Sequence, residues 1–157
     1  MTFRVGIGVD AHKLERGVPL VLGGVRFDFD RGLAGHSDGD VLAHALVDAL
    51  LGAAGLGDIG SLFPSDDEQY RGADSLGLLR EAYRQVQQAG WVLVNADCVL
   101  IGQEPKIARR REEMRERLSA ACGGGEVNVR ATTTDHMGFT GRGEGLAAHA
   151  VALLQRA

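Results

Sequence analysis

The first segment of the chain alternates between apolar residues and small or polar ones. All odd-numbered positions of residues 3–9 are apolar, and this period of two predicts a β-strand with one apolar face. Residues 18–29 contain two more β-rich runs on either side of Gly23 and Gly24, which predicts a hairpin. Residues 91–101 and 127–134 are rich in strand-forming residues, and each predicts a further strand.

Other segments place apolar residues three or four positions apart, as on one face of a helix. Residues 41–53 predict a helix with Ser37 as its N-cap, Asp40 three positions later, and Gly55 or Gly57 at its end.

A second helix is expected over residues 76–86, with Asp74 or Ser75 as its cap. A third is expected to have Pro105 in its first turn and to extend to Ala121, because proline suits the first helical position.

The tail of the chain, residues 146–154, fits either kind of element. Its alanines favour a helix, whereas Ala147, His149 and Val151 also alternate as on a strand.

Mixed strands and helices in 157 residues predict an α/β fold of the α+β sandwich type, with one mixed β-sheet and its helices packed on one face. A single domain over residues 1–157 is expected. The uncovered sheet face would need a partner, which indicates an oligomer.

The chain has 23 glycines, and they gather where elements are expected to meet. Gly6 and Gly8 belong to this set, as do the clusters at 123–125 and 138–145. Glycine at such joints predicts tight turns and pockets lined by backbone, because it adopts conformations that other residues avoid.

Composition narrows the classes of function. The net charge of −4 gives no sign of a nucleic-acid-binding surface. No apolar run approaches the roughly 20 residues that span a membrane, and no signal peptide is recognised. Cys98 and Cys122 have no metal-type spacing and are expected to be small core residues. These features predict a cytoplasmic protein with neither a membrane nor a nucleic acid as its partner.

Candidate chemistry begins at the end of the first strand. Asp10 and His12 are two residues apart, so on a strand they project to the same side. They fit either a strand-end cap or a pair of metal ligands. His44 lies in an apolar helical stretch, where it is either a core histidine or a third ligand, and Asp48 follows one turn later to orient it or reach a bound ligand. One carboxylate and two imidazoles suit zinc with an open fourth position.

Three further segments are candidates for binding phosphate. His36 and Ser37 precede the first helix, where backbone N–H groups and the helix dipole favour an anion. Residues 132–135 enter a glycine-rich loop whose hydroxyls and amides can bind phosphate oxygens, although a plain strand and turn fit equally well. Lys106 is either a phosphate partner or a solvated charge.

Seven segments in order along nearly the whole chain carry a shared pattern. They are GVDAH at 8–12, AGHSDGD at 34–40, HAL at 44–46, LGAAGLGDIGSLFP at 51–64, GADS at 72–75, PK at 105–106 and ATTTDHMGFTGRGEG at 131–145. This set resembles the 2-C-methyl-D-erythritol 2,4-cyclodiphosphate synthases of the non-mevalonate isoprenoid pathway.

The resemblance implies a homotrimer with active sites between neighbouring subunits and a C-terminal strand. It implies Zn²⁺ on Asp10, His12 and His44, and Mg²⁺ or Mn²⁺ at Asp135. His36 and Thr133 would steady the transition state.

The implied substrate-binding residues form three groups. Around the metal and the methylerythritol end are Asp10, Ala11, His12, His36, Ser37, Asp48, Phe63, Pro64, Ser65, Asp66 and Asp67. Meeting the ribose from the neighbouring chain are Asp58, Ile59 and Gly60. At the cytosine, phosphates and central channel are Gly102, Gln103, Glu104, Pro105, Lys106, Ile107, Ala108, Thr132, Thr133, Thr134, Asp135, Phe139 and Arg142.

The sequence departs from the family pattern at three positions. Asp135 stands where the family commonly has glutamate, which shortens the reach to the second metal. His149 stands where a glutamate is usual opposite Arg142, which weakens the case for an isoprenyl diphosphate in the trimer channel. Val9 replaces an aromatic residue near the metal strand.

The implied reaction converts 4-diphosphocytidyl-2-C-methyl-D-erythritol 2-phosphate into 2-C-methyl-D-erythritol 2,4-cyclodiphosphate and CMP. The 2-phosphate would attack the β-phosphate, which makes the enzyme a cyclising phosphorus–oxygen lyase. Two alternatives remain open: a metal-dependent hydrolase of nucleoside-diphosphate esters, and a trimeric module that binds isoprenoid phosphates without catalysis.

Overall fold

The computed structural model describes residues 2–64 and 66–157, so the expected pocket residue Ser65 lies outside the described residues. Five strands form one mixed sheet in the order β4-β1-β7-β5-β6. Their bounds are β1 Phe3–Arg16, β4 Arg31–Leu33, β5 Trp91–Ile101, β6 Glu126–Thr132 and β7 Gly145–Arg156. β5 and β6 are parallel, and the other neighbours are antiparallel. β2 (Leu20–Leu22) and β3 (Val25–Phe27) form the expected hairpin around Gly23 and Gly24.

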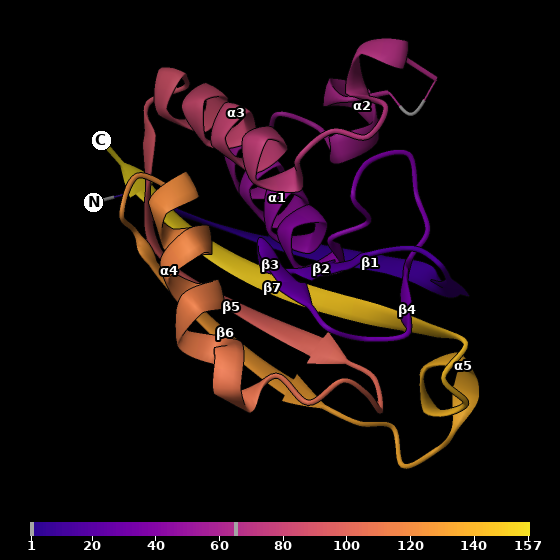
Figure 1. The fold of residues 1–157 in the computed structure, drawn as a ribbon. Coiled ribbons are helices and arrows are strands. Elements are labelled where there is room, and N and C mark those ends of the chain that lie inside the picture. The colour runs from indigo at the N-terminus through magenta and orange to yellow at the C-terminus, as the bar shows by residue number, and fades with distance from the viewer. Residues whose placement is uncertain (1, 65) are drawn as a thin grey trace.

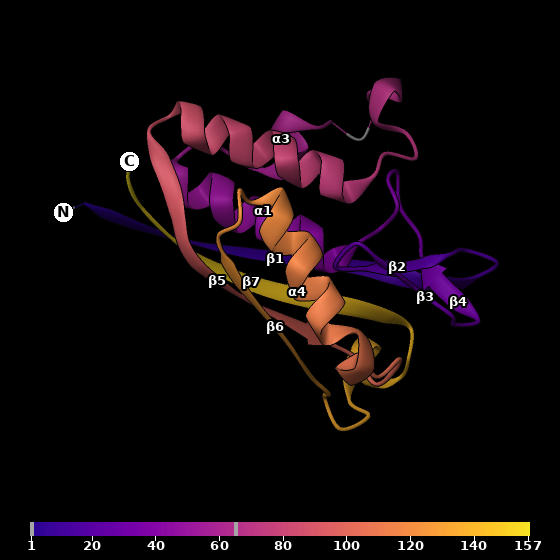
Figure 2. The same cartoon turned by 60° about the vertical axis from the view of Figure 1, so that its left-hand side comes forward.

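Three long helices lie on one face of this sheet (Figures 1 and 2). They are α1 Val41–Ala54, α3 Ser75–Gln88 and α4 Arg111–Ala121. Shorter turns are α2 Ile59–Leu62, α5 Gly138–Gly141 and the 3₁₀ turns η1 Glu68–Tyr70 and η2 Ala108–Arg110. The predicted fold class, one mixed sheet with helices on one face, is confirmed. No helix in the described part of the chain is long and apolar enough to cross a membrane.

Helix α1 lies at the centre of the molecule, between the sheet and α3. Nearly all of its side chains are buried, His44 among them. The predicted start at Ser37 is wrong, because Asp40 is the N-cap and the helix begins at Val41. The fully buried Asp40 carboxylate accepts hydrogen bonds from the amides of Gly23, Gly24 and Ala43, at 2.9, 2.7 and 3.1 Å. It therefore joins the β2–β3 hairpin to the start of the helix.

Two glycines let α1 approach the sheet closely. A Cβ at Gly6 would lie 2.1 Å from the carbonyl oxygen of Ala49, and one at Gly8 would lie 1.8 Å from that of Ala45. The expectation that Gly6 and Gly8 mark joints is therefore wrong. Both lie inside β1, on the face that contacts the helix, where only a residue without a side chain fits.

The C-terminal segment is the strand β7, which lies between β1 and β5. Its even-numbered residues from Leu146 to Leu154 are buried, and these leucines and alanines form the floor beneath α1. His149 and Val151 face the opposite side and are exposed. The alanines that made a helix plausible are here because the closely packed helix leaves room only for small side chains.

The third helix starts later than predicted. Pro105 lies in the loop after β5, joined to Glu104 by a cis peptide bond, and α4 begins only at Arg111. Ile107, which falls inside the predicted helix, precedes the observed one and is buried. Met114 and Leu118 do form the buried face of α4. Pro105 and Ile107 line a cavity instead, and the helix begins about one and a half turns later than predicted.

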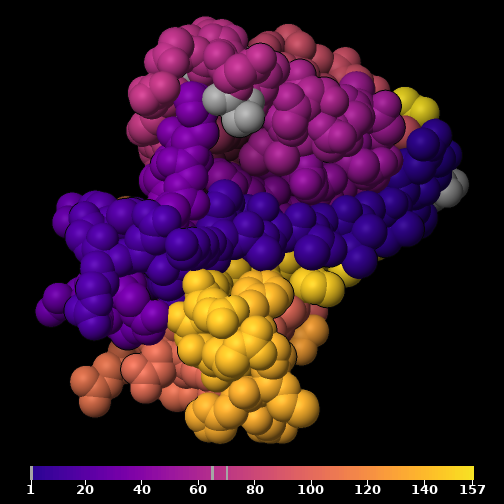
Figure 3. Space-filling model, turned by 90° about the vertical axis from the view of Figure 1, so that its right-hand side faces the viewer, coloured from indigo at the N-terminus to yellow at the C-terminus, as the bar shows by residue number. Residues whose placement is uncertain are grey.

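The face of the sheet away from the helices carries exposed apolar side chains. Val5, Ile7 and Val9 on β1 are 68%, 64% and 54% exposed, and Val151 on β7 is 44% exposed. Figure 3 shows β1 as an indigo band across the surface, between the helical layer above and the C-terminal part of the chain below. An apolar stripe of this kind is typical of a surface that binds a partner.

Candidate metal centre and adjacent cavities

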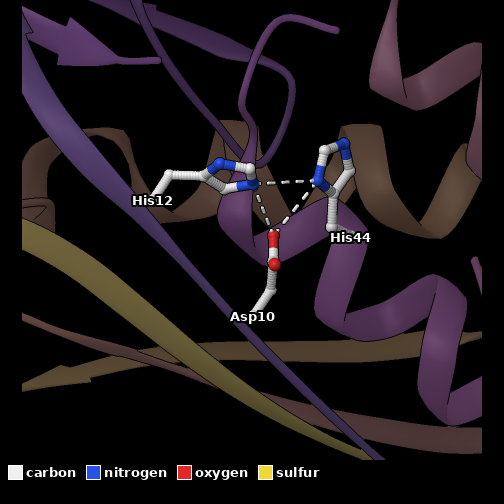
Figure 4. Close-up of side chains that lie close together, drawn as sticks. All are labelled: Asp10, His12 and His44. Carbon is white, nitrogen blue, oxygen red and sulfur yellow. Dashed lines mark hydrogen bonds and ion pairs between the residues drawn. The ribbon is translucent and has the colours of Figure 1, made fainter. Parts of the chain in front are cut away.

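Strand β1 and helix α1 together bring three candidate ligands to one point. Asp10 and His12 continue the helix-facing side of β1 beyond Gly6 and Gly8. His44 immediately precedes Ala45, whose carbonyl oxygen lies over Gly8. The close approach of helix and strand therefore carries His44 to the two strand residues, and Figure 4 shows the three side chains pointing toward one another.

The three donor atoms form a compact triangle. Asp10 Oδ2 lies 2.9 Å from His12 Nε2 and 3.1 Å from His44 Nδ1, and the two ring nitrogens are 3.4 Å apart. Ligands bound tetrahedrally at about 2.0–2.1 Å from a zinc ion are separated from one another by roughly 3.3 Å. The triangle thus has the dimensions of one face of such a coordination shell.

The proton arrangement at His12 also suits a metal. Its Nδ1 donates a hydrogen bond to the carbonyl oxygen of Ala34 at 2.9 Å, so in the neutral ring Nε2 carries a lone pair. That lone pair points at the Asp10 carboxylate, which is itself an acceptor. Acceptors that converge in this way are satisfied only by a proton or a cation between them.

The ionisation of these groups reflects the same convergence. Burial raises the pKa of Asp10, but the adjacent imidazoles of His12 and His44 outweigh burial and hold that pKa at about 2. The hydrogen bond to Asp10 raises the pKa of His12 above 6.5, against the opposing effect of burial. In the metal-free chain a proton on His12 therefore takes the place that a cation would occupy.

A cavity of about 570 Å³ opens beside the triad. Of the residues expected to bind substrate, those lining it besides the triad are His36, Ser37, Ile59, Gly60, Phe63, Pro64 and Asp66. Ile59 and Gly60 were expected to act from a neighbouring chain. Within one chain they line the cavity at the triad, and the Asp48 carboxylate accepts a hydrogen bond from the Ile59 amide at 2.7 Å.

Three of the expected residues near this cavity make local contacts. His36 Nε2 donates to the carbonyl oxygen of Asp67 at 3.1 Å, which ties its ring to the 63–70 loop. The Asp67 and Asp58 carboxylates cap the short turns that follow them, by accepting from the amides of Gln69 and Ser61. Neither carboxylate lines the cavity.

A second group of expected residues lines a separate cavity of about 200 Å³ at the ends of β5 and β6. It includes all of residues 102–108 together with Thr132 and Thr133. Gln103 Oε1 accepts hydrogen bonds from the amides of Thr134 and His136, at 3.3 and 3.2 Å, and so joins the two loops. Among the residues that the structure describes, none lines both this cavity and the one at the triad.

Ala11 and Phe139 line a third cavity, of about 610 Å³, which also borders His12. Asp135 has a positive φ of 53°, at an exposed bend where its carboxylate lies 3.5 Å from the Thr133 hydroxyl. Among the described residues it does not belong to any cluster of metal-ligand type. Arg142 is exposed and pairs with Glu144 at 3.1 Å.

Sequence reasoning missed three residues at these sites. The Ser75 hydroxyl contacts the far side of His44, and Asp38 contacts Ser75. Arg111 lines the cavity at 102–108 with a buried Nε that lacks a hydrogen-bond partner among the described residues. Ser75 and Asp38 lie within matching motifs, but no spacing rule links them to a histidine 31 or 6 residues away. Arg111 lies within the charged run at 109–113, a pattern that is typical of a solvated helix face.

Comparisons with known proteins agree on one family. The family model described as the YgbB family matches residues 3–155. A 2-C-methyl-D-erythritol 2,4-cyclodiphosphate synthase from Moorella thermoacetica is 59% identical over 96% of this chain and 94% of its own length. The bifunctional IspDF from Campylobacter jejuni superposes with a TM-score of 0.95 at 41% identity, and this chain covers 43% of that longer protein and 99% of itself. A solved 2C-methyl-D-erythritol-2,4-cyclodiphosphate synthase with CDP bound has a TM-score of 0.88 and 40% identity, over 97% of this chain and all of that one.

Proposed function

This chain belongs to the YgbB family, and we propose that it is a metal-dependent cyclodiphosphate synthase. In this proposal it converts 4-diphosphocytidyl-2-C-methyl-D-erythritol 2-phosphate into 2-C-methyl-D-erythritol 2,4-cyclodiphosphate and CMP. The synthase names of its relatives and the CDP bound to one of them support the substrate class. The observation that carries the proposal is the triad of Asp10, His12 and His44, whose candidate ligand atoms lie within 4.8 Å of one another beside a large cavity.

The proposed metal at the triad is zinc. Two imidazole nitrogens and one carboxylate oxygen are a donor set that zinc favours, and three protein ligands leave a fourth position open for substrate. Bound there, zinc would supply Lewis-acid polarisation of a phosphate oxygen.

The chain's own side chains have the task of bringing two anionic groups together. The attacking 2-phosphate is already ionised, so neither a serine or cysteine nucleophile nor a strong base is needed. His36 would contact the methylerythritol phosphate end, and Thr133 with its loop amides would donate hydrogen bonds to the charge that develops. Lys106 would neutralise phosphate oxygens. Holding the two phosphates in line supplies the rate advantage of proximity.

The proposed second ion, Mg²⁺ or Mn²⁺, would rest on Asp135. Magnesium sites commonly use one or two carboxylates and complete their coordination with waters and substrate phosphates. A single exposed carboxylate beside phosphate-binding hydroxyls fits that mode. The ion would supply charge neutralisation of the diphosphate.

The proposed assembly is a homotrimer with active sites between subunits. Two observations support it: the exposed apolar stripe on the outer face of β1, and the separation of two groups of expected site residues into two cavities that share none of the described residues. A neighbouring copy could bring the loop cavity of one chain against the triad cavity of another. We also propose a reducing, cytoplasmic location, supported by Cys98 and Cys122, which are free thiols in the core.

Metal-dependent release of CMP tests the proposal. The purified protein is stripped with a chelator, reloaded with zinc and Mg²⁺, and incubated with the cytidyl substrate while CMP is followed by chromatography. We expect turnover only after reloading, and neither zinc binding nor turnover in His44→Ala. The control His136→Asn should retain its zinc, because His136 is outside the triad and asparagine tolerates its positive φ of 65°. Full zinc content and activity in His44→Ala would contradict the proposed site.

A further inference from the structure

The second ring nitrogen of His44 has contacts that the proposed reaction does not use. While Nδ1 faces Asp10 and His12, Nε2 lies 2.8 Å from the hydroxyl of Ser75 and 3.0 Å from that of Ser37. Ser75 is the first residue of α3 and is fully buried. A buried hydroxyl with a fixed partner controls which nitrogen of an adjacent imidazole carries the proton.

The proton of the Ser75 hydroxyl is committed to a carboxylate. Ser75 Oγ donates to Asp38 Oδ1 in a short hydrogen bond, and the Ser75 amide donates to Asp38 Oδ2 at 3.0 Å. The amide of Asp40 also donates to Asp38 Oδ1, at 3.0 Å. An ionised carboxylate only accepts, so all three groups must act as donors to it. Asp38 is therefore held in place by two backbone amides and fixes the direction of the Ser75 O–H bond.

With its hydrogen turned toward Asp38, the Ser75 oxygen has only lone pairs to offer His44. The hydrogen bond at 2.8 Å then requires a hydrogen on Nε2, which leaves the lone pair of neutral His44 on Nδ1. Ser37 cannot impose this alone, because its hydroxyl has no committed acceptor and can either donate or accept. His12 is held in the opposite sense, with its proton on Nδ1 bound to Ala34 and its lone pair on Nε2.

We propose that Ser75 and Asp38 are positioning residues that hold His44 with its proton on Nε2 and its Nδ1 lone pair directed at the metal position. The proposal rests on the proposed metal site and adds two residues to it. Partners of this kind orient a ligating histidine and raise its affinity for metal, and their loss typically weakens binding by about 10- to 100-fold.

A purely structural role for Ser75 is separable from this one. Asp74, not Ser75, is the N-cap of α3, and its Oδ1 accepts from the amide of Leu76 at 3.1 Å. The Ser75 hydroxyl makes no hydrogen bond to the backbone of its own helix. Asp74→Ala is therefore a matched control that weakens the start of α3 without touching His44.

The first measurement needs no substitution. Long-range ¹H–¹⁵N spectra of the metal-free full-length protein, at a pH where His44 is neutral, show which ring nitrogen carries hydrogen. We expect hydrogen on Nε2 of His44 and on Nδ1 of His12. Hydrogen on Nδ1 of His44 would overturn the proposal, whether or not the serine variant folds.

The second measurement is zinc affinity, determined by competition with a chelator. We expect Ser75→Ala to bind zinc about 10- to 100-fold more weakly than the unmodified chain and to give a mixture of His44 tautomers. Asp74→Ala should stay within about twofold. Equal losses in the two variants would assign the effect to helix placement, and no loss in Ser75→Ala would remove the role altogether. If the unmodified chain makes CMP and Ser75→Ala binds zinc as tightly as it does, only this inference is contradicted. If the unmodified chain binds no zinc, the proposed metal site is contradicted as well.

Discussion

Gly8 of strand β1 lies directly under the carbonyl oxygen of Ala45 in helix α1, at a distance that leaves no space for a Cβ atom. Ala45 is the residue after His44, and Gly8 precedes Asp10 by two positions on the same face of the strand. The spacing of the metal triad thus depends on a contact between two backbones. A side chain at this position would separate the strand ligands from the helix ligand.

Gly8→Ala should therefore lose both stability and zinc. The new methyl group would lie 1.8 Å from a helix carbonyl that cannot rotate away, so α1 must move off the sheet. We expect a loss of about 3 kcal/mol or more in the free energy of unfolding, at the upper end for an overpacked core. Urea denaturation at fixed protein concentration and metal analysis measure the two effects.

Gly52→Ala is the matched control on the same helix. Its nearest neighbour beyond α1 itself is the Ile7 carbonyl oxygen, 3.9 Å from the added Cβ, which is an ordinary contact. Alanine should stabilise the helix there by about 0.5–1 kcal/mol, because it restricts the unfolded chain more than glycine does. Equal behaviour of the two variants would show that close approach at Gly8 does not set the geometry.

The buried cap Asp40 should be far more important for stability than the exposed cap Asp74. Asp40→Ala leaves the amides of Gly23, Gly24 and Ala43 without their acceptor, at about 1–3 kcal/mol for each buried group. We expect a total loss of at least about 3 kcal/mol for Asp40→Ala, against about 1 kcal/mol for Asp74→Ala. Denaturant titration of both variants compares them, and similar losses would refute the role assigned to Asp40.

The metal-free protein should lose stability as the pH rises above neutrality. The pKa of His12 is raised above 6.5 in the folded chain by its hydrogen bond to Asp10. A raised folded-state pKa stabilises the fold fully below the unfolded value, and this contribution disappears as the pH rises through the folded value. Melting temperatures between about pH 6 and 9 should therefore fall for the metal-free protein. Zinc replaces that proton, so the zinc-loaded protein should not show this fall. A flat metal-free profile, or one unchanged by Asp10→Asn, would contradict the proton's role.

Mixed assemblies test whether the site is shared between chains. His44→Ala and Thr133→Ala should each be inactive, because each damages one of the two cavities. If the two cavities meet across a subunit boundary, co-expression should restore roughly a quarter of the sites, since that share pairs an intact triad with an intact loop in a randomly mixed ring. If activity stays at the level of the single variants, the two cavities do not form a shared site across a subunit boundary.

Local patterns predicted most elements of this fold. The alternation in residues 3–9, the glycine pair of the hairpin and the helical spacing of residues 41–53 all correspond to observed elements. Helix starts were less predictable. Ser37 looks like a cap in sequence, but its hydroxyl contacts His44. Asp40 caps the helix instead by accepting from the Ala43 amide, and it also accepts from the hairpin amide of Gly24, 16 residues earlier.

The residue types of the candidate site predicted its metal ligands, but not the packing that brings them together. Asp10 and His12 share a strand face by simple alternation. The approach of His44 depends on the absence of a side chain at Gly8, which the pattern of apolar and polar residues does not reveal. The contacts of Ser75 and Asp38 join segments 37 residues apart. Such contacts follow from the packing of α3 onto α1, which no local rule predicts.

Phosphorus NMR and mass spectrometry of the reaction products test the proposed synthase activity most directly. The zinc-loaded protein is incubated with Mg²⁺ and the cytidyl methylerythritol 2-phosphate substrate until CMP appears. The account predicts a cyclic diphosphate, in which one oxygen joins the two phosphorus atoms and no oxygen is incorporated from labelled water. A bisphosphate with two separate phosphate groups, one of them carrying that labelled oxygen, would mean that water is the nucleophile, and it would contradict the cyclisation.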